Sequence, residues 1–162
     1  MGESDSEHRV AGMRAVRFVA AGFGTGYAPL AAGTVASAAA AVTGAGLLAL
    51  SPWLLALAAV LATTVGYLAV KQAAIEGDPG WVVIDEFAGQ WITLLALARP
   101  TVPGLVAAFL LFRLFDITKL GPVGWADRRH GALGIMADDV IAGIIAAVPL
   151  ALIRLTRPEW LT

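Results

Sequence analysis

The chain has 162 residues, enough for one domain, and 59% of them are apolar while only 14% are charged, against roughly 25% in an ordinary soluble domain. A net charge of −1 and a mean hydropathy of +0.79 exclude intrinsic disorder and a broad basic surface for nucleic acid. Cysteine is absent, which excludes disulfides, thiolate metal sites and a cysteine nucleophile.

The first half of the chain predicts a membrane hairpin, because no charged residue or histidine lies between Arg17 and Lys71. A polar N-terminal tail, residues 1–17, precedes this stretch. Residues 35–50 and 53–70 are apolar runs joined by a short turn, and a bilayer core about 30 Å thick asks for about 20 helical residues. Two antiparallel helices are therefore expected here.

Three shorter apolar helices are predicted in the second half, over 81–98, 105–114 and from about 135 or 138 to 153. A solvated loop with an Asp78-Pro79-Gly80 turn precedes them, and a polar, Gly-rich stretch over 121–134 separates the last two. The uncharged cores of these helices are short, so each can span a bilayer only with tilt or with a buried polar cluster. A soluble helical bundle is the alternative for this half of the chain.

The sequence thus predicts an all-α membrane bundle of about five helices, with a Gly-rich re-entrant or loop segment near its N-terminus. We expect a single domain over 18–155 and a C-terminal tail over 156–162. If the helices alternate across a bilayer, eight of the eleven Lys and Arg residues lie on the side of the N-terminal tail, which indicates the cytoplasmic side. The acidic residues follow them, and six gather at one rim with Arg113 and Lys119: Asp85, Glu86, Asp116, Asp127, Asp138 and Asp139.

Adjacent carboxylates begin the third predicted helix. Asp85 and Glu86 could simply complement the dipole of this helix, which favours negative charge by about 0.3 to 1 kcal/mol. Apolar residues bracket the pair, however, and a buried carboxylate requires a cation, hydrogen-bond donors or a metal. A ligand or acid–base role is therefore the favoured interpretation, with a helix cap as the alternative.

Two further groups follow the same pattern. Arg113, Asp116 and Lys119 recur at three-residue steps, so they share one helical stripe, which is either a simple salt bridge or a site offering two cations to phosphate oxygens and a carboxylate to a metal. Asp138 and Asp139 precede an apolar helix and are either a helix cap with a first-turn acid or ligands that face the bundle interior.

Three such acidic groups from three helices on one face favour a site over coincident caps. Hard oxygen ligands suit Mg²⁺, and a phosphate ester would complete its coordination. The two histidines, His8 in the tail and His130 in a loop, do not form a zinc site. A Gly-rich block that lacks a Walker pattern could add backbone donors for an anion or merely form turns: Gly24, Thr25, Gly26 and Thr34.

These motifs together resemble the phosphatidylglycerophosphatase A family over residues 18–150. The resemblance rests on four blocks in order: Gly24-Thr25-Gly26 to Ser37, Asp85-Glu86-Phe87-Ala88-Gly89, Phe112-Arg113 to Lys119, and Gly134-Ile135-Met136 to Gly143. It implies Mg²⁺-dependent hydrolysis of the terminal phosphate of phosphatidylglycerophosphate, giving phosphatidylglycerol and phosphate, at the cytoplasmic membrane of a bacterium. The chain departs from the family pattern in loops around the predicted site, at Ala32, Leu120-Gly121 and the stretch from Asp127 to Gly131.

The mechanism expected from this resemblance assigns a role to each group. Mg²⁺ is held by Asp85, Glu86, Asp116 and one or both of Asp138 and Asp139, while Arg113 and Lys119, with Gly24, Thr25, Gly26 and Thr34, bind the phosphate. Attack by water and an aspartyl-phosphate intermediate both stay open. The rival functions are a phosphatase for another membrane lipid phosphate and an ion or proton transporter, the latter disfavoured because the ionisable residues cluster at one rim. The oligomeric state is not predicted.

Overall fold

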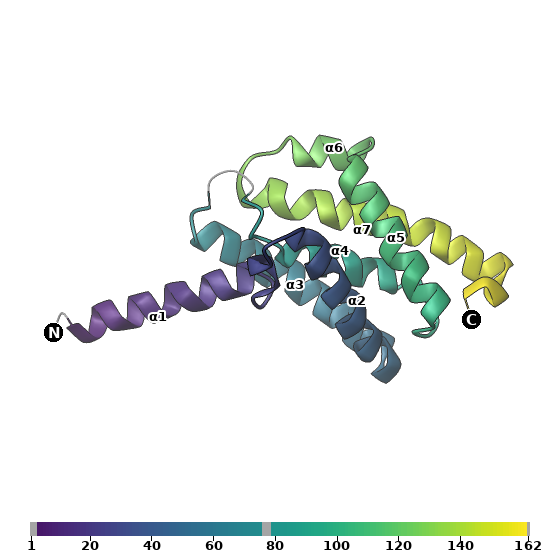
Figure 1. The fold of residues 1–162 in the computed structure, drawn as a ribbon, viewed down its shortest axis with the longest axis horizontal. Coiled ribbons are helices and arrows are strands. Elements are labelled where there is room, and N and C mark those ends of the chain that lie inside the picture. The colour runs from purple at the N-terminus through teal and green to yellow at the C-terminus, as the bar shows by residue number, and fades with distance from the viewer. Residues whose placement is uncertain (1–2, 76–78, 162) are drawn as a thin grey trace.

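The computed structural model describes residues 3–75 and 79–161 and is built from helices (Figure 1). The predicted turn at Asp78 lies outside the described residues. In chain order the α-helices are α1 (Glu3–Ala20), α2 (Ala32–Leu50), α3 (Pro52–Gln72), α4 (Ile84–Leu94), α5 (Val102–Thr118), α6 (Pro122–Asp127) and α7 (Gly131–Thr156), with 3-10 helices η1 (Thr25–Tyr27) and η2 (Pro158–Leu161).

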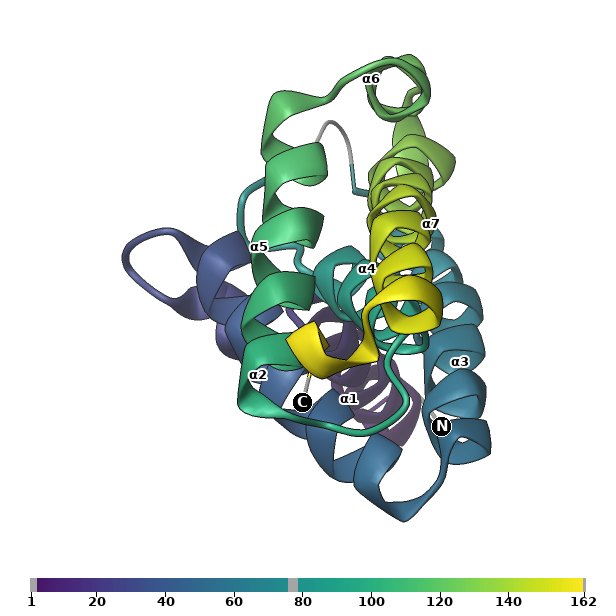
Figure 2. The same cartoon turned by 90° about the vertical axis from the view of Figure 1, so that its right-hand side faces the viewer.

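The short helix α4 is the centre of the bundle. It packs against α2, α3, α5 and α7, which surround it in Figure 2, and nine of its eleven residues are buried. At 1.5 Å per residue, eleven residues are too short to cross a bilayer. Helix α1, by contrast, projects from the bundle (Figure 1). The acidic pair at the start of α4 is therefore held inside a shell of longer helices.

Helices α2 and α3 form the predicted hairpin. The hydroxyl of Ser51 accepts a hydrogen bond from the backbone N–H of Trp53 at 3.2 Å, and Pro52 occupies the first turn of α3, where its missing N–H is not needed. These two residues end one helix and start the next. The hairpin prediction from the charge-free stretch is thereby confirmed.

Three helices of the described residues are long and apolar enough to cross a membrane: α2, α3 and α7. Large apolar side chains remain exposed on the outer faces of the bundle, among them Val42, Leu68 and Leu152 at 73%, 58% and 57%. Exposed apolar surface of this extent marks an interaction with lipid or protein. By length and composition, these three helices have the features of membrane-spanning helices.

The all-α prediction is confirmed for the described residues, whereas the count of about five helices is not. The polar N-terminal segment forms most of α1, and the Gly-rich stretch over 121–134 contains α6 and the first turn of α7. Helix α7 begins at Gly131, not at Ile135 or Asp138, because two glycines in its first turn, Gly131 and Gly134, are typical of a loop and hide the start of the helix in the sequence. The re-entrant character of the Gly-rich segment stays a prediction.

Close contact between α4 and α7 depends on two glycines. A Cβ atom added to Gly143 would meet the backbone carbonyl group of Gly89, and one added to Gly89 would meet the backbone carbonyl oxygen of Asp139 and the ring of Phe112. The two backbones therefore approach more closely than any side chain would allow. This contact sets the distance between the carboxylates of α4 and those of α7.

Candidate active site

The first turn of α4 carries Asp85 and Glu86, which are 9% and 8% exposed. Val83 precedes this turn without a side-chain cap, and its backbone N–H donates to the carbonyl of Ala20 at 3.0 Å. Asp85 Oδ1 accepts a hydrogen bond from the backbone N–H of Glu86 at 3.0 Å. The pair therefore complements the helix N-terminus and is also buried, while its ligand or acid–base role stays a prediction.

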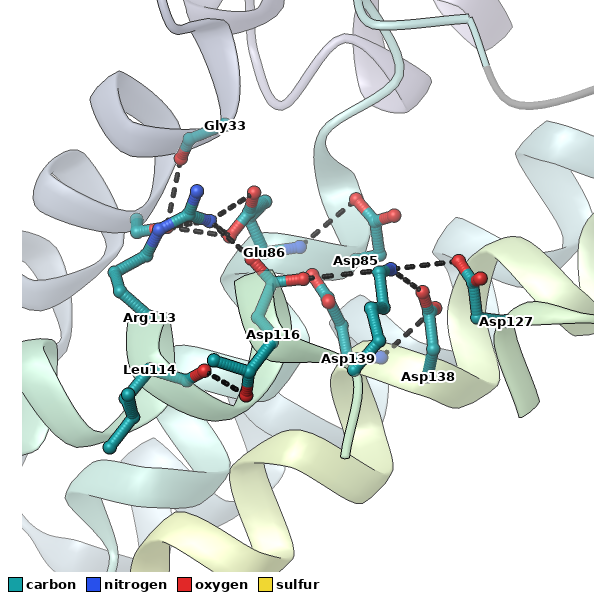
Figure 3. A network of polar contacts seen from close by, with 12 residues as sticks. Gly33, Asp85, Glu86, Arg113, Leu114, Asp116, Asp127, Asp138 and Asp139 are labelled. Carbon is teal, nitrogen blue, oxygen red and sulfur yellow. Dashed lines mark hydrogen bonds and ion pairs between the residues drawn. The ribbon is translucent and has the colours of Figure 1, made fainter. Parts of the chain in front are cut away.

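Arg113 of α5 joins two of the acidic groups. Its Nη1 lies 2.6 Å from Glu86 Oε1, 2.7 Å from Glu86 Oε2 and 2.6 Å from Asp116 Oδ2 (Figure 3). The intrahelical salt bridge predicted as the simpler alternative is thus present. It is one half of a bridge between two helices, which the sequence spacing alone did not predict.

Lys119 joins α5 to α6 and α7. Its Nζ contacts Asp138 Oδ2 and lies 3.0 Å from Asp127 Oδ1 and 3.8 Å from Asp116 Oδ1. The residue ends α5 in a left-handed conformation, with φ of 50°, which turns the chain toward α6. Burial lowers the pKa of Lys119, but the hydrogen bonds that its ammonium group donates to Asp138 and Asp127 outweigh this effect and raise the pKa above its usual range. Lys119 is therefore a fixed cation.

All five predicted carboxylates line one cavity of about 140 Å³: Asp85, Glu86, Asp116, Asp138 and Asp139. We call it the acidic cavity. Lys119 and the backbone at Gly33 also line it. Asp138 and Asp139 are the eighth and ninth residues of α7, so the interpretation as a helix cap with a first-turn acid is wrong for them. Five of the six acidic residues predicted at the rim thus form one buried cluster, whereas Asp127 is exposed and lies outside the acidic cavity, where it pairs with Lys119.

Burial changes the acid–base behaviour of this cluster. Desolvation and, next, the carboxylate of Asp116 together raise the pKa of Glu86 to about 7, against the opposing effects of Arg113 and Ser37. Five carboxylates face only two cations, Arg113 and Lys119, so a fully ionised cavity has an excess of negative charge. A proton or a further cation has to compensate that excess.

The donor set fits a hard divalent cation, since it consists of carboxylate oxygens alone. Within residues 3–75 and 79–161, however, no three acidic or histidine side chains are already arranged to hold a metal ion. Figure 3 shows that Glu86 and Asp116 are instead both paired with Arg113. Metal binding would require some of these ion pairs to loosen.

The Gly-rich residues do not line the acidic cavity. Thr25 donates its hydroxyl to the carbonyl of Gly22 at 2.8 Å, Gly26 packs on the backbone of Trp81, and Thr34 is exposed. Gly24 adopts φ of 96°, a conformation that glycine permits. This segment supports the chain that leads into α4, and a phosphate-binding role for Gly24, Thr25, Gly26 and Thr34 stays a prediction.

Sequence reasoning did not select Ser37, which belongs to the cluster. Its hydroxyl lies 2.6 Å from Glu86 Oε2 and 2.8 Å from the carbonyl of Gly33, one helical turn earlier in α2. A side chain on Gly33 would collide with Glu86 Oε1. The four-residue spacing of Gly33 and Ser37 puts both on one helical face and was the available signal.

Comparisons with known proteins show the family of this chain. The model of the family described as phosphatidylglycerophosphatase A matches residues 18–154. The phosphatidylglycerophosphatase A of Escherichia coli (strain K12) is 42% identical over 80% of this chain and 77% of its own length. That of Haemophilus influenzae is 35% identical over 91% of this chain and 94% of its own length.

A third relative has a different name. A protein of Bacteroides thetaiotaomicron, provisionally named a phosphatidylinositol-3-phosphatase, is 36% identical over 84% of this chain and 91% of its own length. No solved structure matches the chain. On the family match and the identity to its relatives, this chain belongs to the phosphatidylglycerophosphatase A family of phosphatase enzymes.

Proposed function

We propose that this enzyme hydrolyses the terminal phosphate monoester of phosphatidylglycerophosphate, with Mg²⁺ as cofactor, and releases phosphatidylglycerol and phosphate. The single observation that carries the proposal is the acidic cavity, in which five buried carboxylates from α4, α5 and α7 meet Arg113 and Lys119. The names of the Escherichia coli and Haemophilus influenzae relatives support the substrate.

The carboxylates of Asp85, Glu86, Asp116 and Asp139 are the proposed metal ligands, with Asp138 held by Lys119 at the edge of the set. Mg²⁺ would polarise the phosphoryl group and lower the pKa of a bound water. The elevated pKa of Glu86 fits this arrangement, because a carboxyl that is costly to ionise alone gains most from a neighbouring cation.

Arg113 and Lys119 are the proposed phosphate ligands. Each is already oriented by carboxylates, Arg113 by Glu86 and Asp116, so little side-chain entropy is lost when an oxygen of the phosphate replaces one of these contacts. Charge on the phosphoryl oxygens is then met by a guanidinium and an ammonium group that are in position before the reaction. A carboxylate freed in the exchange can accept the proton of the attacking water.

The lipid substrate requires the cavity to lie near the membrane surface. Asp138 and Asp139 lie in the N-terminal third of α7, and the helix beyond them is apolar as far as Arg154, so acyl chains can stay in the bilayer while the headgroup enters the cavity. We place this end at the cytoplasmic face of the inner membrane, because eight of the eleven Lys and Arg residues belong to the segments predicted on that side.

The direct test uses purified protein in detergent with phosphatidylglycerophosphate and either Mg²⁺ or EDTA. We expect phosphate and phosphatidylglycerol to form together, and only with Mg²⁺. Absence of Mg²⁺-dependent release from the wild type would contradict the proposed function.

The name of the Bacteroides thetaiotaomicron relative favours a second candidate, a phosphatase for another membrane lipid monoester. The same assay with phosphatidylinositol 3-phosphate and phosphatidic acid separates the candidates by kcat/KM. We expect phosphatidylglycerophosphate to give the highest value, and a higher value for either other lipid would replace it as the substrate.

A further inference from the structure

A second and larger cavity adjoins the acidic cavity. Its volume is about 580 Å³, and it is lined by the turn between α6 and α7, including Arg128, Arg129 and His130, and by Asp138. Asp138 also lines the acidic cavity, so the two spaces meet at this side chain. We call the larger one the basic pocket. The roles proposed above for the reaction do not use it.

The unpaired charges of the basic pocket are positive. Among the described residues, no ion pair joins Arg128 or Arg129 to an acidic group, and the guanidinium of Arg129 lies 4.2 Å from the ring centroid of Trp125. The two acidic residues that line the pocket, Asp127 and Asp138, are both paired with Lys119. The pocket thus offers two cations without carboxylate partners to a ligand from outside.

The backbone favours the same kind of ligand. Helix α7 is 26 residues long and begins at Gly131, which lines the pocket, and the side chain of His130 does not cap it. The first N–H groups of such a helix have no intrahelical partner and attract an anion. Helix terminus and arginines together make the pocket a site for a phosphate group that is separate from the one in the acidic cavity.

We propose that the basic pocket binds a second phosphate of the substrate, a phosphodiester, while the monoester occupies the acidic cavity. The inference rests on the proposed function, because phosphatidylglycerophosphate carries a monoester at one end of its headgroup and a phosphodiester at the other. Arg128 then determines specificity, since a lipid with a single phosphate monoester cannot use it. The charges of the two cavities fit this assignment. Carboxylates with a metal suit the monoester that is hydrolysed, and arginines suit the phosphodiester that is only bound.

The test compares two soluble competitors of phosphatidylglycerol formation in micelles of an uncharged detergent. Glycerophosphoglycerophosphate has both phosphates, whereas glycerol 3-phosphate has only the monoester. For the wild type we expect the first compound to bind more tightly. Arg128→Gln removes charge-assisted hydrogen bonds and should reduce this preference about tenfold, with little change in the inhibition constant of glycerol 3-phosphate.

Two matched variants complete the design. Arg128→Lys keeps the charge and should restore part of the preference, while Arg99→Gln removes an exposed arginine outside both cavities and should leave it unchanged. Equal weakening of both competitors by Arg128→Gln, or no preference in the wild type, would overturn the inference and leave the proposed function intact. A wild type that forms no phosphatidylglycerol would instead refute the proposed function.

A phosphodiester could also come from a neighbouring lipid. In that case the effect of Arg128→Gln would depend on added phosphatidylcholine and would be the same for both competitors. We expect Arg128→Gln to reduce the preference even without added phosphatidylcholine. A requirement for phosphatidylcholine would overturn the assignment of the pocket to the substrate.

Discussion

Substitution of Gly143 by alanine should separate α4 from α7 and thereby damage the acidic cavity. The added Cβ would lie 2.9 Å from both the Cα and the carbonyl carbon of Gly89, whereas ordinary contacts begin near 3.4 Å. The backbones therefore have to move apart by at least the difference, 0.5 Å. Neither partner can rotate away, because both are main chain, and overpacking of this kind costs about 1 to 3 kcal/mol.

The movement reaches the site directly. Asp139 lies one turn before Gly143 in α7, and Glu86 lies one turn before Gly89 in α4, so the widened contact shifts the carboxylates of one helix against those of the other. A displacement of 1 Å in an active site can cost about 100-fold in rate. We therefore expect Gly143→Ala to lower kcat by about tenfold to 100-fold, with a smaller change in KM.

The assay is steady-state release of phosphate from phosphatidylglycerophosphate with Mg²⁺, with helical content checked by circular dichroism. Gly46→Ala is the matched control, because the site of its added Cβ on α2 has no atom within 4 Å. This control should keep wild-type kcat and gain slightly in stability, since alanine favours a helix over glycine. A Gly143→Ala protein with wild-type kcat would refute the argument that this glycine contact sets the geometry of the cavity.

Three further predictions concern the cluster itself. Because the folded protein binds a proton at Glu86 more strongly than the unfolded chain does, stability in EDTA should be highest below pH 4.5 and fall by up to about 3 kcal/mol as the pH rises through 7. Thermal unfolding measures this, and a Glu86→Gln protein with the same slope would contradict it. Ser37→Ala removes the 2.6 Å contact to Glu86 and should lower kcat about tenfold; unchanged kcat would exclude Ser37 from the site. Arg113 bridges Glu86 and Asp116 through its Nη1, and a lysine side chain is one bond shorter, so Arg113→Lys should weaken the bridge and lower kcat about tenfold or more, whereas full activity would show that a point charge suffices.

The sequence predicted the helical class and the acidic cluster because both follow from local patterns. Uncharged runs of bilayer length predict helices such as α2 and α3, and the few carboxylates within apolar surroundings, Asp85 and Glu86 foremost, stand out against them. The assumption that successive helices alternate in direction across a bilayer then predicted these residues at one end of the bundle. The structure brings them together in the acidic cavity.

The features that were not predicted depend on contacts between distant segments. Ser37 and Glu86 are 49 residues apart, and no local pattern tells that α2 packs against the first turn of α4. The start of α7 lies earlier than predicted, because the two glycines of its first turn, Gly131 and Gly134, resemble a loop in composition. The composition of the Gly-rich segment did not predict that Gly26 packs against the backbone of Trp81, and the phosphate-binding role of this segment stays a prediction.

The most direct test of the acidic cavity as the catalytic site is the activity of Asp139→Asn. Asp139 is 3% exposed and lies among the other four carboxylates, and the substitution preserves its shape while removing its charge. With saturating Mg²⁺, we expect release of phosphate from phosphatidylglycerophosphate to fall by at least about 100-fold, while Glu159→Gln, a change at the far end of the chain, leaves it unchanged. Wild-type activity in a folded Asp139→Asn protein would contradict the assignment of this cavity as the catalytic site.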